Sequence, residues 1–254
     1  MQEVFVMHDL LHELAKYVSG DIYFRWEDAQ TKRIQEVTRH FSVELGFKQY
    51  FDEFETLCNT KRLRTFMPTG RSLNYLWHWG INMLIHDFFS MFKSLRILSL
   101  SYSNLKDLPD SVGNLEHLCS LDLSYTIIQE LNEEICSLSH LQILKLNNCE
   151  YLEELPSNLH LLTNLCRLEF KNTKVRKVPL HLERMRNLMV MMTSFNVGNG
   201  EELSIQRLEK FNLDGSLSIK ELQNIENSQD ALKADLKDYT LDTANNLMLP
   251  LLRP

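Results

Sequence analysis

The hexapeptide Leu95-Arg-Ile-Leu-Ser-Leu100 opens a pattern that decides the fold. It returns as Leu118-Cys-Ser-Leu-Asp-Leu123, Leu141-Gln-Ile-Leu-Lys-Leu146 and Leu165-Cys-Arg-Leu-Glu-Phe170, and Leu188 opens a fifth unit. The starting residues 95, 118, 141, 165 and 188 are 23, 23, 24 and 23 residues apart. In each unit the last two apolar residues are two apart, so an extended backbone turns both to one face. The later apolar residues recur every three or four positions, which predicts a short helical or irregular return segment.

A single turn of this kind cannot bury its own row of leucines, so each coil must stack on the next. A fully buried leucine contributes roughly 1.5–3 kcal/mol, which is enough to hold successive coils together. This pattern is identified as a leucine-rich repeat. The expected fold class is α/β: a solenoid with parallel strands on its concave face, preceded by a short helical remnant.

Small residues and prolines mark the turns of each coil. Three residues beyond the last apolar residue of the hexapeptide we expect side chains that satisfy backbone groups at the bend, namely Ser103, Thr126, Cys149 and Thr173. The third unit carries its one extra residue here, between Asn148 and Leu152. A proline begins the return segment in three of the units, at positions 109, 156 and 179, which suits irregular backbone and not the interior of a sheet.

Composition excludes several classes of protein. The 254 residues are 44% hydrophobic, so the chain can bury a large core, and the net charge of −7 gives no attraction to nucleic acid. No run approaches the roughly 18 apolar residues of a membrane span, and the first residues lack the basic region of a secretory signal. Five cysteines without paired spacing, and the absence of any Asn-x-Ser/Thr acceptor, favour reduced thiols and a cytoplasmic protein.

The flanking segments are less regular than the repeats. We expect a helix from Asp9 to Val18 that ends at Gly20, degenerate coils with strands near Val43 and Phe66, and a loop over residues 67–72. The spacing of Leu84, Ile85, Phe88, Phe89 and Phe92 predicts an aromatic packing helix flanked by Trp77 and Trp79. Beyond Leu188 we expect a strand at 189–192, a loop at 195–202, two more coils near 208–213 and 217–225, and a helix at 230–237.

Four phrases of the sequence resemble plant disease resistance proteins of the coiled-coil type, which are intracellular nucleotide-binding leucine-rich-repeat receptors. They are Val6-Met-His-Asp-Leu-Leu-His-Glu-Leu-Ala15, Thr38-Arg-His-Phe-Ser42, Leu63-Arg-Thr-Phe66 and Gly215-Ser-Leu-Ser-Ile219. The resemblance implies four segments: residues 1–25 as the end of a nucleotide-binding (NB-ARC) region, 26–94 as degenerate repeats and a packing helix, 95–238 as the repeat domain, and 239–254 as a divergent, frayed tail.

The same resemblance implies a role for His8. In the family this histidine faces the phosphates of bound ADP, with the residues at Met7 and Asp9 packing and capping around it. None of the eight glycines precedes a lysine, so the phosphate-binding loop is missing and we expect no cofactor; ADP or ATP would bind only in a full-length parent. A metal site at His8 and His12 is the alternative reading of this stretch, but no third ligand is evident and we predict no metal.

Function is expected on the outward positions of the strands, because their side chains point away from the core. The predicted protein-binding face comprises four columns: Ile97, Ser120, Ile143 and Arg167; Ser99, Asp122, Lys145 and Glu169; Ser101, Ser124, Asn147 and Lys171; and Tyr102, Tyr125, Asn148 and Asn172. Asp122, Lys145 and Glu169 alternate in charge, so either these charges satisfy one another across strands or the face binds a partner, with Tyr102, Tyr125 and Arg167 as anchors.

No catalytic motif is present, so we predict that the chain is not an enzyme. The favoured function is a non-catalytic recognition and autoinhibition module of a plant immune receptor, with a protein partner: a pathogen effector, a guarded host protein or the nucleotide-binding module. The alternatives are a general intracellular scaffold for signalling complexes and a non-functional truncated product.

Overall fold

The computed structural model describes residues 14, 17–26, 34–44, 50–51, 57, 60, 62–69, 80–81, 85–175, 178–197, 208, 210–213, 217–220, 224 and 240–241. Several predicted features lie outside the described residues: Met7, His8, Asp9, His12, Cys58, Trp77, Trp79, Leu84 and the expected helix at 230–237. Within the described part, no helix combines the length and the apolar composition that a membrane span requires.

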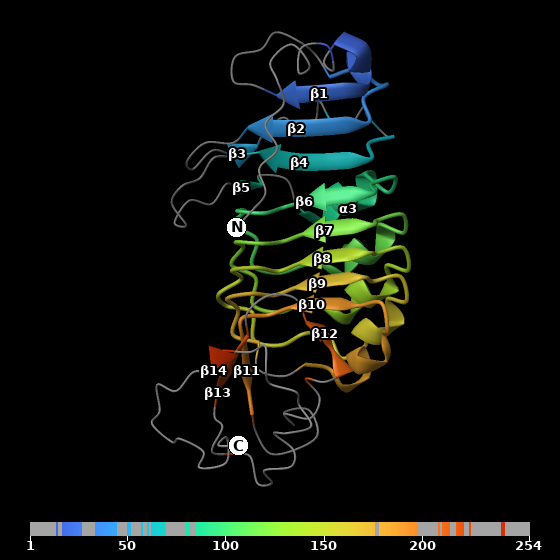
Figure 1. The fold of residues 1–254 in the computed structure, drawn as a ribbon. Helices are drawn as coiled ribbons and strands as arrows, with labels where there is room; N and C mark the ends of the chain where they lie inside the picture. The colour runs from blue at the N-terminus through green and yellow to red at the C-terminus, as the bar shows by residue number, and fades with distance from the viewer. Residues whose placement is uncertain are drawn as a thin grey trace.

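Nine parallel strands form one continuous sheet, with the return segments of the coils packed behind it (Figure 1). The order follows the chain: β1 (Tyr23–Trp26), β2 (His40–Glu44), β4 (Thr65–Thr69), β6 (Ile97–Ser99), β7 (Ser120–Asp122), β8 (Ile143–Lys145), β9 (Arg167–Glu169), β10 (Met189–Met191) and β12 (Asn212–Leu213). Consecutive strands that pair in parallel, each after one return segment, are the architecture of a repeat solenoid, so the predicted fold class is confirmed.

The core is a row of apolar side chains in strict register. Leu98 pairs with Leu121, Leu121 with Leu144, and Leu144 with Leu168 on neighbouring strands, and all four are fully buried. Because each leucine covers the one beside it, no coil exposes its apolar face to water except at the ends of the stack.

Aromatic side chains continue this row toward the N-terminus. Phe24, Phe41 and Phe66 lie on β1, β2 and β4, and their rings stack at centroid distances of 6.1 and 5.7 Å. The predicted aromatic helix is α3 (Ile85–Met91), whose Phe88 meets Phe66 edge-on at 5.2 Å. These rings belong to the same buried cluster as the leucines of the repeats, so the degenerate coils share one core with the regular ones.

Short 3₁₀ helices return the chain to the start of the next strand. They are η2 (Asp110–Asn114), η3 (Glu133–Ser137), η4 (Leu159–Leu161) and η5 (Leu180–Arg184). Pro109 and Pro179 occupy the N-cap positions of η2 and η5, where a residue that lacks a backbone donor is tolerated, and Pro109 is in extended conformation. A fifth, η1 (Gly20–Ile22), follows helical residues 14 and 17–19; Gly20 ends that helix as predicted, with a left-handed φ of 51°.

The small side chains at the bends bind backbone groups, as the sequence predicts. Thr126 Oγ1 donates to the carbonyl of Leu123 at 2.8 Å, and Cys149 Sγ donates to the same carbonyl from the next coil at 3.1 Å. Thr173 Oγ1 donates to Phe170 in the same way, whereas the buried hydroxyl of Ser103 has no partner in the described part of the chain. The bends therefore join neighbouring coils as well as closing each one.

The structure corrects two expected loops. Residues 67–69 belong to β4, where Pro68 pairs with Val43 of β2. On its other side β4 pairs with β6 only at Thr65 and Phe66. The missing N–H of Pro68 therefore faces no strand, and the proline is tolerated. The loop expected from Phe195 begins instead with β11 (Ser194–Asn196), in a second parallel sheet with β13 (Ser218–Lys220) and β14 (Thr240–Leu241).

Strands also lie close to the ends of the expected segments. β14 pairs two residues of the tail that we expected to be frayed, and β1 begins at Tyr23, before the expected end of the N-terminal remnant at residue 25. Two further short strands, β3 (Tyr50–Phe51) and β5 (Gly80–Ile81), pair with each other. Leu14 and Val18, predicted to share an apolar helix face, are 56% and 74% exposed.

Substitution of Leu144 by Ala should strongly destabilise the fold. Leu144 is fully buried between two leucines of the ladder, and the lost burial and residual cavity typically cost about 2–5 kcal/mol. Leu161→Ala is the matched control, because Leu161 is 54% exposed and its loss should cost no more than about 0.5 kcal/mol. The urea midpoint followed by circular dichroism measures both; equal midpoints for the two variants would contradict the buried ladder.

Acid should loosen the contact between the return segments of the second and third repeat units through Glu133. Burial raises the pKa of this carboxyl, but hydrogen bonds from the side chain and backbone of Ser157 and from Asn158 outweigh that effect and hold the pKa below its usual value. A lowered folded pKa means that the stabilisation is present above the unfolded pKa and is lost as pH falls through the folded one. Glu133→Gln should therefore reduce the dependence of the thermal midpoint on pH in the acid range. A curve unchanged by this substitution would contradict the assignment.

Candidate protein-binding face

Residues of four neighbouring strands make up two of the four predicted columns. Ile97, Ser120, Ile143 and Arg167 are register partners on β6 to β9, and so are Ser99, Asp122, Lys145 and Glu169. Eight of the sixteen predicted face residues therefore lie in register on these strands, and the other eight lie in the turns that follow. Ser99, Ser124 and Glu169 are buried. His8, Met7 and Asp9 lie outside the described residues.

The first column is partly apolar. Ile97 is 38% exposed, Ile143 is half-buried, and Ser120 lies between them on β7. Burial of aliphatic area of this kind by a partner would favour binding.

The charged groups of the face pair within a strand and not across strands. Arg167 Nε donates to Glu169 Oε1 at 2.5 Å, and Asn147 Nδ2 donates to Glu169 Oε2. Asn147 in turn accepts the backbone N–H of Lys171 at 2.9 Å. Glu169 is only 6% exposed, so its charge depends on these two donors. The idea that Asp122, Lys145 and Glu169 neutralise one another is therefore wrong for Glu169.

Lys145 remains available to a partner. Asp122, its neighbour in the column, accepts the backbone N–H of Ser124 at 3.0 Å, and among the described residues no salt bridge joins Lys145 to either carboxylate. Lys145 is half-buried, and its strand lies between those of Asp122 and Glu169. Such a charge can be paired by an incoming carboxylate.

The fourth column has an unusual backbone that the sequence analysis missed. Tyr102, Tyr125, Asn148 and Asn172 all have φ between 56° and 61°. Asn tolerates this left-handed conformation, whereas a bulky side chain there carries strain. Asn at the same slot in two successive units was the signal from which the turn could have been inferred.

The side chains of this column support one another. The rings of Tyr102 and Tyr125 stack at a centroid distance of 4.3 Å with an interplanar angle of 8°, and Asn172 Nδ2 donates to Asn148 Oδ1 at 2.9 Å. Asn172 also receives support from the next coil, because its backbone N–H donates to Thr193 Oγ1 at 2.7 Å. The edge of the face is thus a stacked, ordered column with a half-buried aromatic pair at one end.

The buried cysteines have little nucleophilic character. Burial and the nearby carboxylates of Glu133 and Glu134 raise the pKa of Cys136 to about 12, and burial also raises the pKa of Cys149. Both thiols are therefore protonated at neutral pH. Cys119, Cys136, Cys149 and Cys166 are all free of disulfides.

Comparison with known proteins gives the same architecture. A model of the leucine-rich repeat region matches residues 70–238. The Arabidopsis thaliana protein named for disease resistance, At3g14460, is 36% identical over 234 residues, which are 92% of this chain and 16% of that protein. RGA4 of Solanum bulbocastanum, also named for disease resistance, is 38% identical over 160 residues, 61% of this chain and 16% of its own length. The chain thus spans a small part of these relatives.

Solved structures share the fold alone. The leucine-rich-repeat protein LIC12759 of Leptospira interrogans has a TM-score of 0.56 at 16% identity, covering 78% of this chain and 47% of its own. An internalin, InlF of Listeria monocytogenes, has a TM-score of 0.53 at 16% identity, covering 83% of this chain and 62% of its own.

Arg167→Ala should destabilise the protein even though Arg167 lies on the outer face. Within the described part of the chain, its loss removes the cation that pairs with the nearly buried Glu169 carboxylate, and a buried group that loses a partner typically costs about 1–3 kcal/mol. Thermal unfolding should show the loss, and Arg167→Ala combined with Glu169→Gln should recover part of it. A double variant no more stable than the single one would argue against this pair.

Proposed function

The chain belongs to the leucine-rich-repeat family, and on that premise we propose that it is the protein-recognition and autoinhibition module of a plant intracellular immune receptor. It acts in the cytoplasm and performs no chemistry of its own. The proposed segments are the end of a nucleotide-binding region at 1–25, degenerate repeats and a packing helix at 26–94, the repeat domain at 95–238 and a divergent tail at 239–254.

The observation that carries this proposal is the mixed character of the face between Ile97 and Asn172. An exposed isoleucine, a stacked tyrosine pair and a lysine with no salt bridge among the described residues lie along a rigid ladder of strands. The ladder holds these groups at fixed spacing before any partner arrives, which lowers the entropic cost of binding. Tyrosines of this kind are frequent hot spots, so Tyr102 and Tyr125 are the proposed anchors.

Resemblance to disease resistance proteins supports the biological setting. The relatives in Arabidopsis and Solanum carry that name, and the match to At3g14460 extends over 92% of this chain. The proposed partners are a pathogen effector, a guarded host protein or the nucleotide-binding module of the receptor. A general signalling scaffold is the competing function, and it would have no affinity for a nucleotide-binding module.

Charge reversal on the face should weaken binding to such a module by at least tenfold. The variant Ile97→Glu/Lys145→Glu replaces an exposed aliphatic contact and an unpaired cation, and leaves the Arg167–Glu169 pair intact. Binding is measured by biolayer interferometry, with a separately produced nucleotide-binding module of a plant disease resistance protein immobilised on the sensor.

The matched control, Leu161→Glu/Lys106→Glu, makes the same two changes at exposed positions outside the face. Its affinity should equal that of the wild type, and the thermal midpoints of both variants should stay near the wild-type value. Binding by neither the variants nor the wild type would favour the scaffold, and equal binding by all three would remove this face from the proposal.

A further inference from the structure

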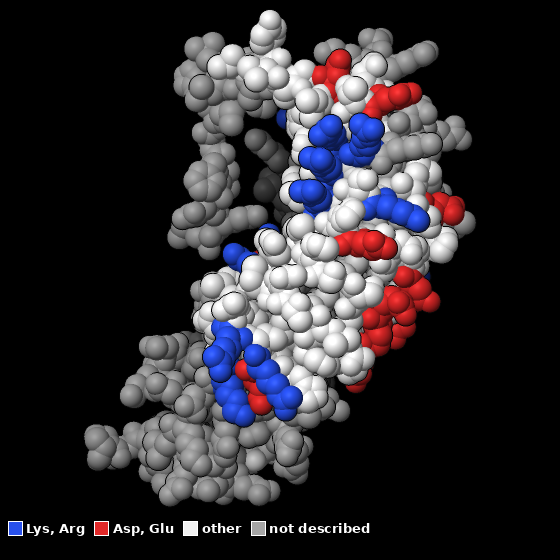
Figure 2. Space-filling model, turned by 90° about the vertical axis from the view of Figure 1, so that its right-hand side faces the viewer, with Lys and Arg blue, Asp and Glu red and all other residues white. Residues whose placement is uncertain are grey.

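Three arginines stand on successive rungs at the entry side of the sheet. Arg39, Arg64 and Arg96 each precede a strand, and their backbones form one ladder: Arg64 N donates to Arg39 O at 2.7 Å, and Arg96 N donates to Arg64 O at 2.8 Å. Neighbouring parallel strands are about 4.8 Å apart, so the three side chains start from equally spaced points. Figure 2 shows Lys and Arg side chains gathered over this part of the face. We call these three residues the arginine column.

The arginine column lacks counter-charges. Arg64 and Arg96 are exposed, Arg39 is half-exposed, and none of the three has a salt bridge or a side-chain hydrogen bond within the described part of the chain. Like charges on adjacent strands repel, so this arrangement costs stability in the free protein. In the following coils the same position holds Cys119, Gln142 and Cys166, so the charge is confined to the first coils. An anion bridging neighbouring guanidiniums would remove the repulsion.

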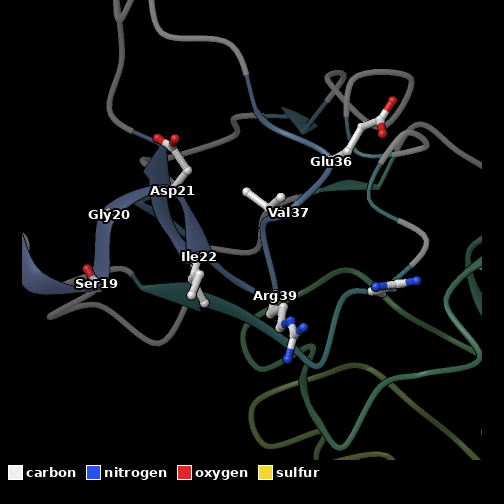
Figure 3. Close-up of a pocket in the computed structure, with 8 residues that line it drawn as sticks. Ser19, Gly20, Asp21, Ile22, Glu36, Val37 and Arg39 are labelled. Atoms are coloured by element: carbon white, nitrogen blue, oxygen red, sulfur yellow. The ribbon is translucent and has the colours of Figure 1, made fainter.

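A pocket adjoins the arginine column. It has a volume of about 950 Å³ and is lined by the segment from Ser19 to Ile22, by Glu36 and Val37, and by Arg39 together with Arg62, which is also exposed. Figure 3 shows the carboxylates of Asp21 and Glu36 on one side and the guanidinium of Arg39 on the other. The cationic end therefore opens toward the arginine column, and a pocket of this size suits a small molecule.

The arginine side chains of this site favour phosphate as the bound anion. All four cations are arginines, and the planar guanidinium binds phosphate oxygens with two parallel hydrogen bonds, which a lysine cannot do. With rungs about 4.8 Å apart, one phosphate can receive donors from two neighbouring arginines.

The rest of the surface limits the length of the ligand. Exposed carboxylates lie on the coils that follow, at Asp107, Asp110, Glu130 and Glu134, and Asp and Glu side chains border the basic region in Figure 2. With a net charge of −7, an extended polyanion would be repelled once it passed the column. The site therefore suits a short ligand.

We infer that the arginine column and Arg62 bind a small soluble molecule that carries two or more adjacent phosphate groups. The phosphates lie along Arg39, Arg64 and Arg96, and the remainder of the molecule occupies the pocket beside Ile22 and Val37. This site is separate from the protein-binding face and does not depend on the proposed function.

The test is isothermal titration calorimetry of the whole chain with sodium tripolyphosphate, and with citrate at the same ionic strength. Wild type should bind tripolyphosphate at least tenfold more tightly than citrate. Arg39→Gln/Arg64→Gln/Arg96→Gln should lose at least tenfold in affinity, and the three Arg→Lys changes should lose several-fold because the charge remains but the paired donors do not. If circular dichroism shows that the triple Gln variant does not fold, the affinity of Arg64→Gln for tripolyphosphate is measured instead, because Arg64 is exposed and its substitution should leave the fold intact.

The matched control is Arg184→Gln/Arg186→Gln/Lys106→Gln, which removes the same charge from exposed positions elsewhere. It should bind tripolyphosphate like the wild type. An equal loss in this control, equal affinity for citrate, or no binding by the wild type would overturn the inference. A polyglutamate peptide that binds as tightly, with the same dependence on the three arginines, would assign the column to acidic polypeptide instead and would also overturn it.

Discussion

Burial of one apolar row, in register across parallel strands, is the constraint on which the rest of this structure depends. Leu98, Leu121, Leu144 and Leu168 are each fully buried by the neighbour before and the neighbour after. A shift of one residue in any strand would turn its leucine to solvent and a polar residue to the core. The register is therefore fixed by the core, and every outward residue inherits a defined position from it.

The outward side chains use these positions in different ways. At one end of the sheet Arg39, Arg64 and Arg96 form no salt bridge with any residue that the structure describes, whereas on β9 the carboxylate of Glu169 is nearly buried and held by Arg167 and Asn147. The same spacing between strands thus holds the arginine column in one place and the hydrogen-bonded cluster around Glu169 in another. Exposure and partners, and not position in the repeat, distinguish a residue that is free to bind from one that supports the fold.

The repeat core could be predicted from sequence because its period is a direct record of the stacked coils. The four columns of the face follow from the same period, but the pairing within them does not. Arg167 reaches Glu169 two residues along its own strand, a choice of rotamer that spacing cannot reveal. The turn-forming residues at 67–69 wrongly predicted a loop, because pairing with β2 overrides the local preference of Pro68. The left-handed tyrosines were missed because Tyr is an uncommon residue in that conformation.

The extra residue of the third unit has a consequence for how such a molecule can change in length. The addition lies in the bend after Cys149, where Tyr151 is turned out to 49% exposure beneath Lys174, while Leu144 and Leu168 keep their pairing. Insertions at the bends are absorbed locally, whereas the strands tolerate none. Duplication or deletion of a whole unit would leave every remaining rung in phase, so recombination between units offers a route to longer or shorter recognition surfaces without redesign of the interior.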